Sequence, residues 1–237
     1  MKFLTAEWRK LIMANYLVEP ALLLPYLPAG TELDYWNGKL HLSLVGFMFL
    51  NTKVLGLPIP FHRNFEELNL RFYVKYQHEG EWRRGVVFIK EIVPKRMITL
   101  VANTIYGEHY ETLKTDHRIS TTTDRLKVEY HIQKNKVWHK IKAEAINKPL
   151  PIKEGSEVEF ITEHFWGYTK INKKRTAQYE VGHPTWDFYD VDKFEVEGDF
   201  SAIYGNQFNF MNETPDSVFL AEGSEIFVMK GASVLVP

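Results

Sequence analysis

Residues 66–75 read Glu-Glu-Leu-Asn-Leu-Arg-Phe-Tyr-Val-Lys, and this stretch predicts a β-strand with two unlike faces. Side chains alternate along a strand, so every second residue shares a face. The apolar face, which belongs against a core, consists of Leu68, Leu70, Phe72 and Val74. The polar face consists of Glu67, Asn69, Arg71, Tyr73 and Lys75. Taken alone, the polar face is that of a half-exposed strand with a weak Glu–Arg pair; the alternative is a row that lines the cavity of a barrel.

The composition favours a large folded domain built mainly from strands. The chain has 237 residues, of which 45% are hydrophobic and 14% aromatic, enough for a substantial core. Its 12 Tyr and 16 Phe favour strands over helices. No linker or low-complexity tract interrupts the sequence, so we expect a single domain over residues 1–237.

Charge and cysteine content exclude several classes of function. The net charge of −1 offers no general basic field, so a nucleic-acid partner is not expected. Without Cys, the chain has no disulfides, thiolate catalysis or Cys-based zinc sites. Its start lacks the apolar run of a signal peptide, and the most apolar stretch, 40–50, is too short to span a bilayer. We therefore expect a cytoplasmic protein without a membrane partner.

Three helical regions are predicted. The first 30 residues are interpreted as two short helices, the second starting near Pro20 and stopped at 28–30. In 94–106, apolar residues recur at helical spacing between Pro94 and Gly107, which predicts the best helix of the chain. A weaker helix is predicted over 196–204.

The rest of the sequence predicts strands. An Asn-Gly turn after Trp36 is expected to join the first two strands as a hairpin, and 53–65 is interpreted as a long loop. Many antiparallel strands with few helices predict a mainly β (α+β) fold, a barrel or strongly curved sheet that helices partly cover. Besides 66–75, the expected strands are 31–36, 39–50, 82–91, 109–113, 116–123, 126–135, 138–148, 157–164, 166–172, 175–181, 217–220 and 225–229.

Outside 66–75, chemistry-bearing patterns are few. His183-Pro184-Thr185-Trp186 is unusual and suits either a pocket wall or a packed loop anchor. The nine His show no ligand spacing, so neither a metal site nor a cofactor is expected. Phosphate loops, dinucleotide fingerprints and nucleophile elbows are absent from the sequence.

Several segments together resemble the YqjF-like family, an uncharacterised conserved family of the acetoacetate decarboxylase-like superfamily. The most specific is Glu-x-Asn-x-Arg-x-Tyr-Val at 67–74. The others, in order along nearly the whole chain, are 8–9, 15–18, 27–34, 85–88 and 183–186. The resemblance implies a single antiparallel β-barrel of the acetoacetate decarboxylase-like type with an internal cavity, often in a homodimer.

The resemblance also implies roles for individual residues. The decarboxylases form a Schiff base on one of two adjacent lysines that follow a helix. The matching stretch here, 107–111, reads Gly-Glu-His-Tyr-Glu, so the missing lysines argue against that activity. Glu67 matches a pocket glutamate and Arg9 a substrate-binding arginine. Lys90, placed on one face with Val86 and Phe88, is the one lysine that could restore the chemistry, unless it reaches solvent.

Three functions remain open. In the first, the cavity binds a small organic acid or ketone: Arg9 or Arg71 pairs with a carboxylate, and His109, Tyr110 and Trp186 shape the walls beside Glu67 and Asn69. In the second, a lyase- or hydrolase-like enzyme uses Glu67 or His109 as proton carrier. In the third, side chains fill the barrel and its role is structural.

Overall fold

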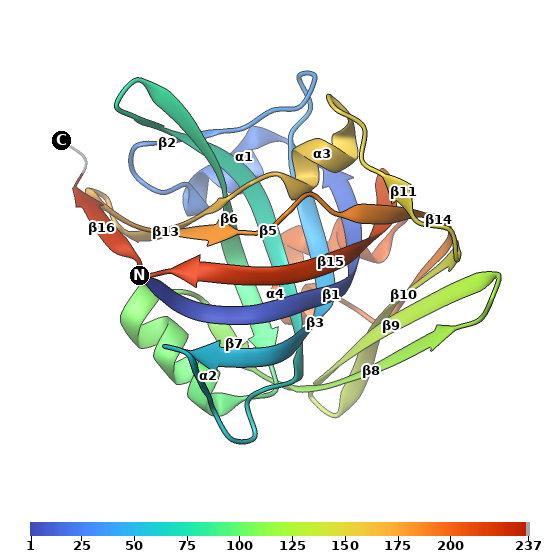
Figure 1. The fold of residues 1–237 in the computed structure, drawn as a ribbon. Coiled ribbons are helices and arrows are strands. Elements are labelled where there is room, and N and C mark those ends of the chain that lie inside the picture. The colour runs from blue at the N-terminus through green and yellow to red at the C-terminus, as the bar shows by residue number, and fades with distance from the viewer. Residues whose placement is uncertain (236–237) are drawn as a thin grey trace.

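The computed structural model describes the backbone of residues 1–235 and, except at positions 105, 106 and 235, their side chains. The fold is mainly β, as expected (Figure 1). Five long strands pair antiparallel in the order β6-β5-β3-β1-β15. They are β1 (Lys2–Leu17), β3 (His41–Val54), β5 (Phe65–His78), β6 (Glu81–Val93) and β15 (Ser217–Met229).

Two groups of strands extend this sheet. Beyond β6 come β12 (Trp166–Asn172), β13 (Arg175–Gly182) and β16 (Ala232–Leu235), and β13 also pairs with β15. Beyond β15 come β14 (Asp187–Glu197), β10 (Val137–Ile146), β9 (Arg125–Lys134) and β8 (Lys114–Thr121). The short strands at the margins are β2 (Thr31–Leu33), β4 (Leu57–Pro58), β7 (Tyr110–Thr112) and β11 (Leu150–Pro151).

The helices are short. The α-helices are α1 (Pro20–Leu23), α2 (Arg96–Val101), α3 (Glu157–Thr162) and α4 (Ser201–Tyr204). A π-helical turn, Ala102–Tyr106, continues α2 up to Gly107, whose φ of 69° ends it near the predicted position. Two 3₁₀ turns, Leu24–Tyr26 and Asn206–Asn212, follow α1 and α4. None of the helices in residues 1–235 has the length and apolar character needed to cross a bilayer.

Two predicted elements have the wrong type. The segment before α1 is the strand β1, because pairing with β3 on one side and β15 on the other overrides local propensity. The predicted strand 157–164 is helix α3. There Ser156 accepts a hydrogen bond from the Glu159 backbone N–H at 3.2 Å, and the Glu159 carboxylate accepts one from the Gly155 N–H. This capping pattern was readable in the sequence.

Other predictions fail at the level of pairing or boundaries. β2 pairs with β5 rather than with β3, although Asn37 and Gly38 do form the expected turn. The loop 53–65 contains β4, and β14 was not predicted at all. The helix expected over 196–204 begins only at Ser201, and 217–220 and 225–229 belong to one strand, β15.

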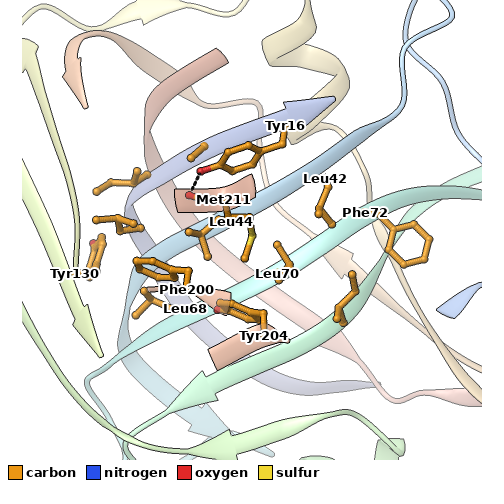
Figure 2. Close-up of a cluster of buried hydrophobic side chains, with 14 of the residues drawn as sticks. Tyr16, Leu42, Leu44, Leu68, Leu70, Phe72, Tyr130, Phe200, Tyr204 and Met211 are labelled. Carbon is orange, nitrogen blue, oxygen red and sulfur yellow. Dashed lines mark hydrogen bonds between the residues drawn. The ribbon is translucent and has the colours of Figure 1, made fainter. Parts of the chain in front are cut away.

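The apolar face of β5 lies in a fully packed core. Leu68, Leu70 and Phe72 are completely buried in one hydrophobic cluster with Tyr130 of β9 and Tyr204 of α4. Figure 2 shows Leu68 beside Phe200, the residue that precedes α4. Helix α4 and the hairpin β9–β10 therefore cover this side of the sheet, while the polar face of β5 looks toward the opposite side.

Candidate functional site

Three residues of the polar face of β5, Glu67, Asn69 and Arg71, line a cavity of about 400 Å³. Glu67, Asn69 and Arg71 are 3%, 2% and 9% exposed, so the interpretation of this face as solvated is wrong. Aromatic and aliphatic side chains form most of the remaining wall. A hollow of this size that combines apolar walls with a few polar groups is the usual form of a small-molecule site.

Strand register gathers the polar groups at one place. Asn69 lies opposite Glu91 on β6, and Glu91 lies beside Tyr110 on β7. The Tyr110 hydroxyl donates a hydrogen bond to Oε2 of Glu67 at 3.2 Å, and Nδ2 of Asn69 donates to Oε1 of the same carboxyl at 3.0 Å. Three adjacent strands therefore build one wall, and Glu67 is held at its centre.

A β-bulge in β6 decides which of its residues enters this wall. Leu70 pairs with Lys90 but Arg71 pairs with Phe88, so one extra residue is inserted and the alternation of β6 is reset. As a result Phe88 and Glu91 line the cavity and Lys90 does not. The predicted common face of Lys90 and Phe88 is therefore wrong. Lys90 instead donates hydrogen bonds to Glu111 at 3.0 Å and to the Ile203 carbonyl at 2.5 Å.

Glu108, not His109, enters the cavity from the segment that follows the helix. Glu108 is 7% exposed and Tyr110 lines the same cavity, whereas His109 is exposed and is absent from the lining. Adjacent residues of an extended chain point in opposite directions, so His109 and Tyr110 could not both face inward. That alternation, applied to the sequence, would have selected Glu108.

Burial raises the pKa of all three carboxyl groups, those of Glu67, Glu91 and Glu108, above the ordinary value. Burial raises the pKa of Glu67 to about 7 and that of Glu108 to about 7. The pKa of Glu91 lies well above its ordinary value because of burial and because Glu108 and Glu67 are close. Thr169, Tyr179 and Glu91 stabilise the Glu108 carboxylate in part. Near neutral pH the cluster thus holds protons and can both donate and accept hydrogen bonds.

This acid cluster has no geometry for a metal ion. In the described part of the chain, no group of three or more His, Asp or Glu side chains is arranged to hold one.

Arg71 supplies the cation of the cavity. Its NH2 group donates to the Ile161 carbonyl at 3.3 Å, and its guanidinium lies 5.7 Å from the Tyr73 ring centroid. Its Nε–H is buried without a hydrogen-bond partner. A buried donor without a partner is unfavourable by about 1–3 kcal/mol, which an anionic ligand would relieve.

Arg9 does not reach the cavity, contrary to the prediction. It binds Glu7 at 2.8 Å and the Gly223 carbonyl at 3.1 Å, and its side chain is 32% exposed. Its neighbour Trp8 lines the cavity instead.

His164 is a cavity residue that the sequence did not reveal. Its Nε2 lies 3.2 Å from Oδ2 of Asp34, which also accepts a hydrogen bond from Arg84 at 2.7 Å. Burial lowers the pKa of His164 to about 4, so the ring is neutral, its proton is on Nε2, and Nδ1 is left as a buried acceptor without a partner. The misassignment of 157–164 as a strand hid this position, which lies two residues after the end of α3.

The segment 183–186 is both wall and anchor. Trp186 and His183 line the cavity, and their rings stack with centroids 4.2 Å apart. The indole N–H of Trp186 donates to Ser224 at 2.8 Å, which satisfies its one polar atom.

Sequence comparison identifies the family. A profile described as an uncharacterized conserved protein, DUF2071, matches residues 5–225. The chain belongs to the DUF2071 family. It is 27% identical over 184 residues to the uncharacterized protein YqjF of Bacillus subtilis (strain 168). The matched region covers 76% of this chain and 72% of YqjF.

Solved structures share the fold of this DUF2071 protein. Acetoacetate decarboxylase from Legionella pneumophila superposes with a TM-score of 0.68 at 14% identity, over 98% of this chain and 87% of that one. An acetoacetate decarboxylase-like enzyme from Sphingomonas wittichii RW1 superposes with a TM-score of 0.65 at 11% identity, over 100% of this chain and 95% of that one. The enduracididine biosynthesis enzyme MppR, complexed with pyruvate, superposes with a TM-score of 0.64 at 12% identity, over 100% of this chain and 91% of that one. At these identities the likeness shows the fold alone.

Proposed function

We propose that this DUF2071 protein binds a small oxo- or carboxylic acid inside a barrel-like sheet, without forming a Schiff base. The observation that carries the proposal is the buried, unpartnered Nε–H of Arg71 in the wall of the cavity. An acid's carboxylate would accept from it, and charge-assisted hydrogen bonds of this kind are among the stronger ones in proteins.

The acid cluster complements this anchor. Protonated Glu67 or Glu108 can donate a hydrogen bond to a ligand's oxo group, which a permanently charged carboxylate could not do. The pyruvate bound to MppR, a protein of the same fold, fits this ligand class. The pairing of β13 with β15 supports the barrel form, and a cavity of about 400 Å³ argues against a filled interior.

Two features favour binding without an imine. No lysine is among the described residues that line the cavity, and Lys90 is engaged elsewhere by Glu111 and the Ile203 carbonyl. Pyruvate with borohydride should therefore leave no adduct on the protein, as intact-mass spectrometry would show.

The test is calorimetric titration of pyruvate into wild-type protein, Arg71→Gln and Arg9→Gln. Loss of a charge-assisted contact predicts about 10- to 100-fold weaker binding for Arg71→Gln. Arg9→Gln, which changes an arginine outside the cavity, should bind as the wild type does. Arg71→Lys, which keeps a charge, controls for folding together with the circular dichroism of each variant. Equal binding by Arg71→Gln and the wild type would refute the proposal.

A second function, an acid–base enzyme, is favoured by the carboxyl pKa values near 7. Ionised Glu108 would take a proton from the carbon beside the ligand's carbonyl, while a protonated neighbour donates to the enolate oxygen; the proton then returns to carbon. Exchange of the pyruvate methyl protons in D₂O, followed by NMR, measures this step. It should accelerate as pH rises through 7 and fall at least about 100-fold in Glu108→Gln. Exchange at the uncatalysed rate would remove this function and leave binding intact.

A further inference from the structure

The cavity is polar at one end and apolar at the other. Along the inward face of β5 the order is Arg71, Asn69, Glu67 and then Phe65, with successive residues about 7 Å apart. The Phe65 ring stacks on Phe49 of β3, their centroids 4.8 Å apart at an angle of 16°. The polar wall thus ends at Glu67, and an aromatic wall continues toward the loop between β4 and β5.

The opening of the cavity lies at the apolar end. Among its described lining residues, the exposed ones are Ile59, Met97 and Val101, at 39%, 55% and 38%. Ile59 belongs to the β4–β5 loop, and the other two lie on α2, which Figure 1 shows near the end of β3. A ligand at the polar end is therefore connected to solvent through an apolar passage.

Exposed apolar side chains continue around this opening. Leu57, Phe61 and Leu100 are 68%, 89% and 59% exposed. An exposed apolar patch around a cavity opening indicates a binding site for an apolar group.

The cavity is also larger than a three-carbon acid requires. At about 30 Å³ per water-sized group, its 400 Å³ accommodates about thirteen such groups, whereas pyruvate has about six non-hydrogen atoms. The unfilled part lies along Phe65, Phe49 and Phe88, where an apolar group can be buried without a polar partner.

We infer that the ligand is an acid with a hydrocarbon chain. Its carboxylate and any oxo group lie at Arg71 and the acid cluster, and its chain runs past Phe65 to the opening between Ile59 and Met97. This inference rests on the proposed function and narrows it from small acids to medium-chain, amphipathic ones.

The test is a series of straight-chain 2-oxo acids from pyruvate to 2-oxodecanoate, titrated calorimetrically below their micelle concentrations. Burial of each methylene is worth about 0.8 kcal/mol, so affinity should rise up to about fourfold per methylene. The rise should stop once the chain passes the opening.

Substitutions at the opening sharpen the test. Ile59→Asp and Met97→Asp place a charge beside the chain and should weaken binding of 2-oxooctanoate about tenfold or more, and binding of pyruvate, which does not reach the opening, by much less. Val137→Asp is the matched control: Val137 is an exposed apolar residue at the start of β10 and does not line the cavity, so binding of neither ligand should be affected. All three changes are at exposed positions and should not impair folding.

The outcomes separate the two proposals. If pyruvate binds but affinity does not change with chain length, the inference is overturned and the proposed function stands. Straight-chain alcohols of the same lengths provide the converse case. If they bind with the expected length dependence while no acid binds, the proposed function is overturned, and with it the inference that the ligand is an acid. A length dependence that Ile59→Asp and Met97→Asp leave unchanged places the chain elsewhere and overturns the inference.

Discussion

The two faces of β5 are both buried, but they meet different surroundings. Leu68, Leu70 and Phe72 belong to a buried hydrophobic cluster that also contains side chains of α4 and β9 (Figure 2). Glu67 and Arg71, on the opposite face, border a cavity of about 400 Å³. The packed side favours folding through apolar burial, whereas the hollow side retains buried polar groups whose desolvation opposes folding. One strand therefore supports the fold with one face and offers a site with the other.

The largest expected contrast is between two leucines. Leu70→Ala removes a fully buried side chain from the packed side and should lower the free energy of unfolding by about 2–5 kcal/mol. Leu11 is equally buried but lines the cavity, so part of its surface already faces empty space. Leu11→Ala should therefore lower the free energy of unfolding by about half as much as Leu70→Ala does. Urea denaturation of both variants measures this, and equal losses would contradict the contrast between the two sides.

A second expected effect concerns pH on the hollow side. Folding raises the pKa of Glu108 from 4.5 to about 7, so the folded state binds this proton more tightly than the unfolded chain. The unfolding free energy therefore falls as pH rises from about 4.5 through 7. Glu108→Gln removes this dependence and should be up to about 3 kcal/mol more stable than the wild type at pH 8.

At pH 4, where both states of the wild-type chain hold the proton, Glu108→Gln should match the wild type. Denaturation at the two pH values gives the comparison, and Glu154→Gln, at an exposed position, is the control. A stability difference that is the same at pH 4 and pH 8 would contradict the assigned pKa.

The smallest expected effect concerns the tautomer of His164. Since Asp34 accepts the Nε2 proton, ¹⁵N NMR of the wild type at pH 6 should show one neutral tautomer. Asp34→Ala removes the acceptor, so a mixture of the two neutral tautomers should replace the single one. The hydrogen bond to Asp34 is expected to favour the Nε2-protonated tautomer by about 1 kcal/mol. A protonated ring at pH 6, or a mixture already in the wild type, would show that Asp34 does not fix the ring.

Local patterns predicted several features correctly. Alternation fixed the two faces of β5, and helical spacing found α2 close to its limits. The same local reasoning failed where long-range pairing overrode it, as in β1, which forms a strand because β3 and β15 pair with it on both sides. For the candidate site, the sequence found Glu67, Asn69, Arg71, Tyr110 and Trp186, which line the cavity, but also Arg9 and His109, which do not.

What the sequence by itself determined is the existence of a polar strand face, since alternation is a property of each strand alone. Whether that face met water or a cavity was decided by the tertiary structure, because burial depends on segments distant along the chain. The bulge in β6 shows the limit most clearly. One inserted residue exchanged Lys90 for Glu91 in the cavity wall, and only the pairing of β6 with β5 reveals that insertion. That shift decides whether the cavity presents an amine or a carboxyl group.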